Sequence, residues 1–139
     1  MFRTSHEAEA AFYAAFEAGD VDAMMSVWAD DNAIVCIHPM GPRLEGQAGV
    51  RDSWTQILAG GNDGVAFEIS HTIRSESDGL ATHLVIENIT FGAGMTERSI
   101  VYATNVYRDA GDGWRMICHH GSPGRVGTVQ LVEPTGAIH

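Results

Sequence analysis

The order of the hydrophobic patterns along this chain is the feature that most limits its fold. Through much of the first 58 residues, apolar side chains recur at helical spacing. After that point they fill long segments typical of β-strands: Val65–Ser77, Leu80–Phe91, Thr96–Arg108 and Trp114–Ser122. The separators between these segments contain glycine, as hairpin turns do. Helices followed by an antiparallel meander predict an α+β fold, with the helices packed on one face of the sheet.

The N-terminal part predicts three helices with recognisable ends. Thr4 followed by Glu7 forms a capping box for the first helix, and Gly19 provides a stop at its C-terminus. Asp20 can cap a second, short helix that ends at the polar residues 30–32. A short strand and a third helix are then expected, at Ala33–His38 and from about Gln47.

The charge balance argues against several classes of partner. The chain has 139 residues, a length typical of one domain, and its formal net charge of −10 repels nucleic-acid phosphates and anionic lipid. The first 20 residues lack the features of a signal peptide, and no apolar run is long enough to cross a bilayer. We therefore expect a cytoplasmic protein without nucleic-acid or membrane partners. Cys36 and Cys118 are expected to be reduced core residues.

The element order and three strings resemble the nuclear transport factor 2-like superfamily and, within it, the SnoaL-like proteins. The strings are FYAAFEAGDVDAMMSVWADDN, HPMGPRLEG and WRMICHHGSPG. The resemblance extends to about Arg125 and implies a cystatin-like cone, in which the N-terminal helices pack on a curved antiparallel sheet around one pocket. We therefore expect one domain over residues 1–125 and a C-terminal tail, 126–139, that could add an edge strand. This superfamily has many activities, so the resemblance predicts the fold more than the function.

The chain also resembles steroid Δ-isomerases through its first helix and the segment ending at His38. Those enzymes carry an aspartate base at the position of His38. Their oxyanion hole uses a tyrosine of the first helix and a protonated aspartic acid, at positions that correspond to Phe12 and to Thr104 or Asn105. Without two strong donors, stabilisation of an enolate loses its largest contribution. Steroid isomerase activity is therefore not the expected function.

A third resemblance is to the association domain of calcium/calmodulin-dependent protein kinase II, through GPRLEG, TNVYR and WRMICHHGSPG. The resemblance implies a pocket with basic residues at positions matching Val50, Val85, Asn105 and Gly121, none of which is basic here. It therefore favours oligomerisation over an anionic ligand. Both alternating sets of residues on Thr96–Arg108 are largely apolar, which favours a homodimer whose sheets pack together.

Four polar residues are candidates for a site inside the cone. His38 and Glu87 are the candidate catalytic residues, because imidazole titrates near neutral pH and burial raises the pKa of a carboxylate. Asn105 is the only polar member of its set, so it should be hydrogen-bonded to the ligand or to the protein. Of His119 and His120, only one can face the pocket; the resemblance favours His119, although a bulge would exchange them.

Aromatic residues are expected to wall the same pocket, although packing of the helices on the sheet explains them equally well. These candidate ligand-binding residues are Phe12, Phe16, Trp28, Trp54 and Tyr107. The histidines lack the spacing that presents metal ligands together, so we expect neither a metal nor another cofactor.

Three functions remain open on this basis. The first is a cofactor-independent enzyme of the isomerase, dehydratase or hydrolase type, in which His38 is the base and the substrate is a small apolar or amphipathic molecule. The second is a ligand-binding domain without catalysis. The third is an association module whose product is the homo-oligomer itself.

Overall fold

The computed structural model describes residues 1–59, 64–92, 94 and 96–125. Three helices come first: α1 (Ser5–Ala18), α2 (Val21–Val27) and α3 (Gly46–Ile57). The short strands β1 (Val35–Ile37) and β2 (Arg43–Glu45) lie between α2 and α3. Four long strands follow, and each matches a segment expected from the sequence to within two residues: β3 (Ala66–Ser77), β4 (Leu80–Phe91), β5 (Glu97–Asp109) and β6 (Trp114–Pro123).

The strands form one mixed sheet in the order β2-β1-β6-β5-β4-β3. The expected α+β class is confirmed, but the expectation of a wholly antiparallel sheet is wrong. β1 runs parallel to β6, because the chain enters β1 from the helices rather than through a hairpin, and β2 extends the sheet beyond it. The expected edge strand in the tail lies outside the described residues.

Both ends of α1 and the start of α2 are determined locally, as expected, whereas α2 ends at Val27, before the expected polar residues 30–32. Thr4 Oγ1 accepts the Glu7 N–H at 3.1 Å, while the Glu7 carboxylate accepts the Arg3 N–H. Gly19 adopts a left-handed conformation with φ of 68°, and its N–H caps the end of α1. Asp20 then accepts the Ala23 N–H and begins α2, so the helical pair follows from sequence-local hydrogen bonds.

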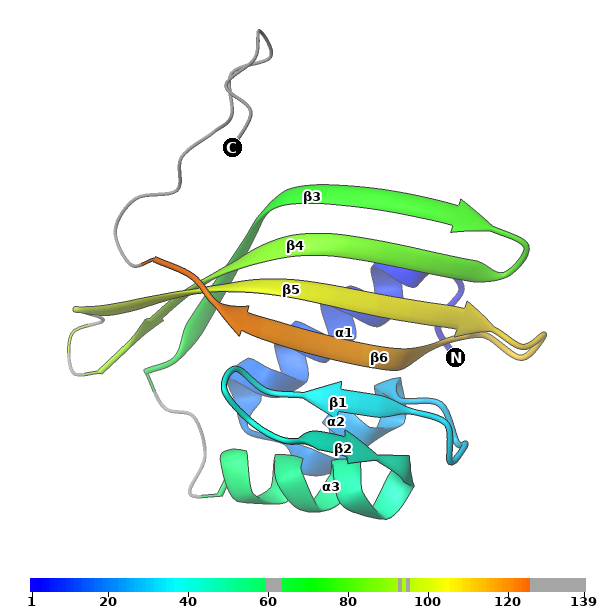
Figure 1. Cartoon of the computed structure of the whole chain (residues 1–139), viewed down its shortest axis with the longest axis horizontal. Helices are drawn as coiled ribbons and strands as arrows, with labels where there is room; N and C mark the ends of the chain where they lie inside the picture. The colour runs from blue at the N-terminus through cyan, green and yellow to red at the C-terminus, as the bar shows by residue number, and fades with distance from the viewer. Residues whose placement is uncertain (60–63, 93, 95, 126–139) are drawn as a thin grey trace, which may run out of the picture.

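The helices cover only one face of the curved sheet. Figure 1 shows α1 lying across the back of β4, β5 and β6, while the near face of the long strands carries no helix. The C-terminal part of α1 is tied to β3 by a 2.8 Å hydrogen bond from the Phe67 N–H to Glu17. No helix in the described part of the chain is long and apolar enough to cross a membrane.

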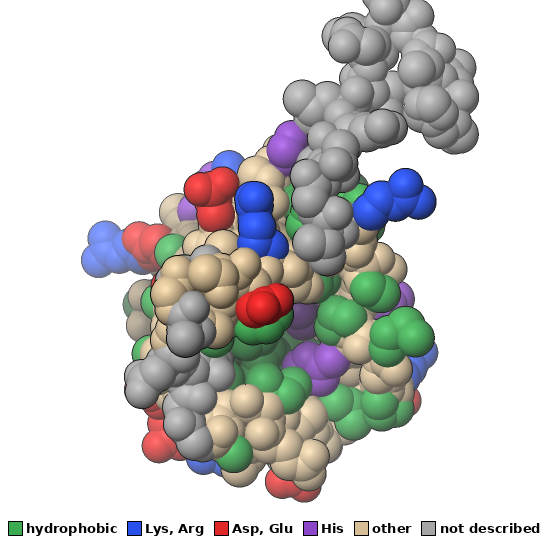
Figure 2. Space-filling model, turned by 90° about the vertical axis from the view of Figure 1, so that its left-hand side faces the viewer, with side chains coloured by type: hydrophobic (Ala, Val, Ile, Leu, Met, Phe, Trp, Pro, Cys, Tyr) green, Lys and Arg blue, Asp and Glu red, His purple; other side chains and the backbone are tan. Residues whose placement is uncertain are grey.

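One end of this layered structure is hollowed. The loop between β1 and β2 and the C-terminal ends of α1 and α3 lie at this end, together with the start of β3 (Figure 1). Figure 2 looks at this end and shows a histidine side chain in a depression bordered by hydrophobic side chains. We call this end the mouth of the cone. It is the side from which a small molecule could approach the interior.

Candidate functional site

A polar stripe on α1 faces the sheet. Ser5, Glu9 and Tyr13 are spaced four residues apart, so they lie on one side of the helix, and all three are buried. Opposite them, β4 presents His83 and Glu87 at the same spacing of four residues. Alternate strand residues point to the same face, so both β4 side chains meet the helix. Two buried hydrogen-bond networks form between these elements.

The first network joins α1 to three strands. Tyr13 donates a 2.6 Å hydrogen bond to Glu87 Oε2, and Asn105 Nδ2 donates to the Tyr13 hydroxyl at 3.0 Å. His119 Nδ1 lies 2.6 Å from Asn105 Oδ1, so it carries the proton and donates. The three donors therefore form a chain of hydrogen bonds that runs from His119 through Asn105 and Tyr13 to Glu87. His119 Nε2 carries a lone pair and lies 4.0 Å from Glu87 Oε2. The four side chains of the network are therefore arranged almost in a ring.

A bulge in β6 decides which histidine joins this network. Trp114 and Met116 face the core, so regular alternation would turn His120 inward. The pairing with β5 shifts by one residue at Ile117, because Tyr107 pairs with Met116 and Val106 with Cys118. The extra residue reverses the alternation, so His119 is buried and His120 is exposed. The expected orientation of His119 is thus confirmed.

Burial shifts the pKa values of Glu87 and His119, the two ends of the first network, in opposite directions. Desolvation raises the pKa of Glu87 to about 7, although the hydrogen bond from Tyr13 opposes the shift and the Glu9 charge adds to it. Desolvation lowers the pKa of His119 to about 3, with a smaller contribution from His38. Near neutral pH the network therefore contains an uncharged histidine and a carboxyl group that can gain or lose a proton.

The second network lies further along α1. His83 Nδ1 is 2.8 Å from Glu9 Oε2, and His83 Nε2 is 2.9 Å from Ser5 Oγ. The order resembles a hydrolytic triad, but only 1% of Ser5 is exposed, so no substrate reaches its hydroxyl. Desolvation raises the pKa of the buried Tyr107 hydroxyl, and the nearby Glu9 carboxylate adds to the shift. These contacts hold α1 against the sheet.

His38 lies at the mouth, at the end of β1. Its Nε2 is 3.1 Å from Ser53 Oγ, and Ser53 donates its own hydrogen to the Val50 carbonyl. Nε2 also lies 3.6 Å from Cys36 Sγ, and the donor and acceptor roles at Nε2 depend on the tautomer. In the tautomer protonated at Nε2, Ser53 Oγ accepts the hydrogen bond and Nδ1 carries the lone pair. Desolvation lowers the pKa of His38, so the free nitrogen is unprotonated at neutral pH. The His38 and His119 rings are 6.4 Å apart between centroids.

The structure places the four polar candidates, His38, Glu87, Asn105 and His119, in the same region between the helices and the sheet. Glu87, Asn105 and His119 belong to the first network, so the alternative of an exposed strand glutamate at position 87 is wrong. His38 is a half-buried neighbour rather than a hydrogen-bonded member. The expectation that Asn105 has partners is confirmed, and these partners are protein side chains.

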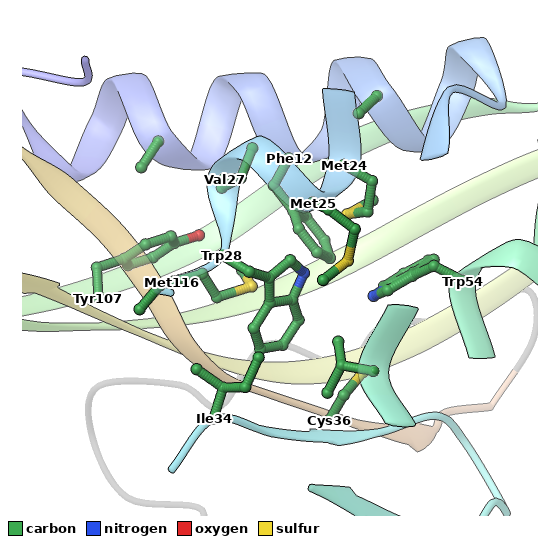
Figure 3. Packing of buried hydrophobic residues seen from close by; sticks show 14 of the residues in the cluster. Phe12, Met24, Met25, Val27, Trp28, Ile34, Cys36, Trp54, Tyr107 and Met116 are labelled. Carbon is green, nitrogen blue, oxygen red and sulfur yellow. The ribbon is translucent and has the colours of Figure 1, made fainter. Parts of the chain in front are cut away.

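The aromatic candidates belong to the packed core, which also contains Met24 and Met25. Phe12, Trp28, Trp54 and Tyr107 are buried members of this core, and Phe16 packs against it (Figure 3). Trp54 also reaches the polar site, because its ring lies 4.8 Å from the His38 ring and 6.3 Å from the His119 ring. Trp54 therefore separates the hydrophobic core from the histidines at the mouth.

Sequence reasoning missed Tyr13 and the second network. Phe12 and Phe16 were the candidates on the first helix, but Tyr13 is buried as well and its hydroxyl reaches Glu87. The helix is covered widely enough to bury two adjacent aromatic residues. The spacing of Ser5, Glu9 and Tyr13 was the available signal, since polar residues at intervals of four mark one helix face.

The basic pocket implied by the kinase-associated domains is absent from the corresponding positions. Val50, Val85 and Asn105 are buried without charge. At Gly121, an added Cβ would lie 3.1 Å from both Pro39 and Val101, so any side chain there would require these neighbours to shift. Among the described residues, no group of three or more histidine, cysteine, aspartate or glutamate side chains could hold a metal ion. Both cysteines are free, as expected.

The uncovered face of the sheet carries a shallow groove of about 350 Å³. It is lined by side chains that point away from the helices, among them Leu84, Tyr102 and His120. Leu84 and Tyr102 are each 43% exposed, which is a large fraction for apolar side chains in the middle of a sheet.

Comparison with known proteins assigns this architecture to a family. The model of the SnoaL-like domain matches residues 6–125. The chain belongs to the SnoaL-like family. The match covers the described helices and strands apart from Ser5, the first residue of α1, and so includes the other residues of both buried networks.

Solved structures agree with this assignment. The SnoaL-like chain is 41% identical to a Thiobacillus denitrificans structure named as a candidate calcium/calmodulin-dependent protein kinase type II association domain; the TM-score is 0.79, with 90% of this chain and 98% of that chain covered. A Streptomyces avermitilis structure named as a candidate dehydratase of the NTF2-like family is 31% identical, with a TM-score of 0.76 and coverage of 86% and 93%.

The cystatin-like fold is confirmed by a third structure, from Nostoc punctiforme. It is 16% identical, has a TM-score of 0.73, and is covered over 91% of this chain and 97% of that chain. At that identity the likeness concerns the fold alone. No curated protein matches the SnoaL-like chain.

Proposed function

We propose that this SnoaL-like chain binds a small apolar or amphipathic molecule at the mouth of the cone and moves a proton on it without a cofactor, as an isomerase or dehydratase does. The observation that carries the proposal is the network of Tyr13, Asn105 and His119 around Glu87, whose pKa is raised to about 7. A group that titrates near the working pH can both accept and return a proton.

His38 is the proposed base at the entrance to this interior. In the tautomer protonated at Nε2, Ser53 holds the ring and the Nδ1 lone pair is the acceptor that proton removal needs. Glu87 is the proposed proton carrier at the deeper position. Tyr13 would stabilise negative charge on Glu87 through its direct hydrogen bond, and Asn105 would support Tyr13 by donating to its hydroxyl.

The Streptomyces avermitilis relative supports this reading, because a dehydration also requires one proton to be removed and another to be delivered. Its name concerns that protein, and the identity of 31% makes the same class of chemistry a reasonable proposal for this chain. Glu9 contributes a charge that acts on Glu87, while His119 is uncharged near neutral pH, and such weakly charged surroundings suit an apolar substrate.

Proton exchange with solvent tests this proposal without knowledge of the natural substrate. Small ketones in deuterated water would be followed by proton NMR, since removal of a proton beside a carbonyl replaces it with deuterium. We expect the wild-type protein to accelerate exchange of some ketones and the variants His38→Gln and Glu87→Gln to lose about 100-fold or more.

The matched control is His120→Gln, because His120 is adjacent to His119 in sequence but exposed on the other face. It should exchange ketone protons at the wild-type rate. Equal rates in wild type, His38→Gln and buffer across the ketones tested would remove the enzymatic proposal.

A second candidate function is homo-oligomerisation through the uncovered sheet face. Two observations favour it: the exposed Leu84 and Tyr102 in the groove, and the 41% identity to the candidate association domain. Leu84→Asp should dissociate an oligomer that forms there, whereas Ile57→Asp on α3, where Ile57 is 39% exposed, should not. Light scattering at micromolar concentration measures the outcome, and a monomeric wild-type protein would exclude this function.

A further inference from the structure

Two buried tryptophans have indole N–H groups without an acceptor. Trp28 Nε1 and Trp54 Nε1 are inaccessible to solvent and have no hydrogen-bond partner, while only 2% and 0% of the residues are exposed. Leaving a buried donor unpaired costs about 1–3 kcal/mol. Two such donors in one core therefore indicate a position where an acceptor is missing.

The two indoles come from different segments of the chain. Trp28 follows the last turn of α2, and Trp54 lies in α3. Figure 3 shows the nitrogen-bearing edges of the two rings turned toward each other, with the side chain of Met25 between them in this view. A thioether is a weak acceptor on a flexible side chain, and Met25 satisfies neither indole.

The side chains around the two indoles indicate what kind of acceptor would pair with them. An indole N–H only donates, so the partner must accept two hydrogen bonds, as the two lone pairs of one carbonyl oxygen do. The neighbouring side chains Phe12, Ile34 and Cys36 are apolar and fully buried, and desolvation raises the pKa of the Cys36 thiol. The chain has eight basic residues, and none of them is buried in the core. A carboxylate would therefore be desolvated without a counter-charge, whereas an uncharged carbonyl would not.

We propose that Trp28 and Trp54 form a binding site for the oxygen of an uncharged carbonyl compound, and that the Met25 side chain moves aside when this oxygen enters. Trp54 connects the site with the polar interior, because its ring also contacts His38. A carbonyl compound held by the indoles would extend toward the histidines. The assignment of carbonyl compounds as substrates of the polar interior rests on the proposed function. The indole site itself is tested by binding, without turnover.

Indole resonances provide the test. The chain contains three tryptophans, so a ¹⁵N–¹H spectrum has three indole signals, which Trp28→Phe and Trp54→Phe assign. Cyclohexanone is the probe, methylenecyclohexane has the same shape without an oxygen, and cyclohexanecarboxylate carries a charge. We expect cyclohexanone to move the Trp28 and Trp54 proton signals downfield to saturation, while the Trp114 signal stays in place. Neither control compound should produce this shift.

Two further variants make the test sharper. Met25→Ala should tighten cyclohexanone binding by about tenfold because the side chain no longer has to be displaced, whereas Met25→Leu, which keeps the volume, should not. Trp28→Phe should weaken binding by about tenfold, since one donor is lost. A titration in which methylenecyclohexane shifts both indoles as much as cyclohexanone, or in which cyclohexanone shifts neither, would overturn the site.

Glu87→Gln separates this inference from the proposed function. The variant should lose proton exchange but retain the response of both indoles to cyclohexanone. Absence of exchange in the wild type with an intact indole response would reject the catalytic function alone. Exchange without any indole response would reject the carbonyl site alone.

Discussion

The Tyr13 hydroxyl donates a 2.6 Å hydrogen bond to the Glu87 carboxylate, which joins the first helix to the middle of the sheet. The two residues are 74 positions apart in sequence. The bond favours the charged form of Glu87, whereas the burial that accompanies it favours the neutral form, and burial is the larger effect. This balance places the titration of the carboxyl group near neutral pH.

The first prediction concerns the pH dependence of stability. The folded protein binds the Glu87 proton more tightly than the unfolded chain, because the pKa rises from 4.5 to about 7 on folding. The Glu87 contribution to the free energy of unfolding is therefore greatest below pH 4.5 and is lost as the pH rises through about 7. The loss amounts to roughly 3 kcal/mol.

Glu87→Gln should lack this contribution. Urea unfolding of both proteins between pH 4.5 and 8 gives the difference in the free energy of unfolding, in which the opposite contribution of His119 largely cancels. Glu68→Gln, at an exposed position of β3, should follow the wild type. A wild-type profile parallel to that of Glu87→Gln would contradict the buried, titrating carboxyl group.

The second prediction concerns Tyr13→Phe. Loss of the hydroxyl removes the hydrogen bond that lowers the Glu87 pKa, so the pKa should rise further above its ordinary value. Asn105 loses its acceptor at the same time, and the free energy of unfolding should fall by about 1–3 kcal/mol. Carbon NMR of the glutamate carboxyl groups measures the titration.

Tyr102→Phe is the matched control for this change, because it removes the same hydroxyl from an exposed tyrosine on the uncovered face. Its Glu87 titration and its stability should equal those of the wild type. A Tyr13→Phe protein with an unchanged Glu87 titration would show that the hydroxyl does not act on the carboxylate.

The third prediction concerns coupling between the two buried networks. The Glu9 charge contributes to raising the Glu87 pKa without contacting Glu87. Glu9→Gln should therefore lower the Glu87 pKa, in the direction opposite to Tyr13→Phe. It should also destabilise the fold by about 1–3 kcal/mol, because His83 loses its buried carboxylate partner.

Glu7→Gln removes a charge from the exposed side of the same helix and serves as the control. It should weaken the N-terminal cap slightly but leave the Glu87 titration unchanged. If Glu7→Gln and Glu9→Gln moved the Glu87 titration equally, the effect would be one of net charge and not of the buried network.

Much of the fold could be predicted because its signals are local. The Thr4 and Asp20 caps, the left-handed Gly19 and the glycine turns each act within a few residues, and the long strands follow from the hydrophobic pattern. The parallel pairing of β1 with β6 could not be predicted in this way. It depends on how a strand of three residues, Val35–Ile37, docks against a segment more than 80 positions later.

Some residues of the candidate site could likewise be predicted from the sequence, and others could not. Asn105 and Glu87 could be recognised from the sequence because each is a polar residue among apolar neighbours on a strand. Tyr13 could not be assigned a face, since Phe12 beside it fits the helical stripe equally well and both prove to be buried. Ser53 was missed because its role, holding one nitrogen of His38, exists only when α3 lies beside β1.

The sequence by itself determined both ends of the first helix, the start of the second, the long strands, the family and the polar residues that belong to an interior. Only the tertiary structure decided that Tyr13 reaches Glu87 and that a bulge at Ile117 turns His119 inward. The physical reason is the range of the interactions. Caps and turns are set by neighbouring residues, whereas a side chain's face and partner depend on which distant segments pack together, and a single extra residue in a strand reverses them.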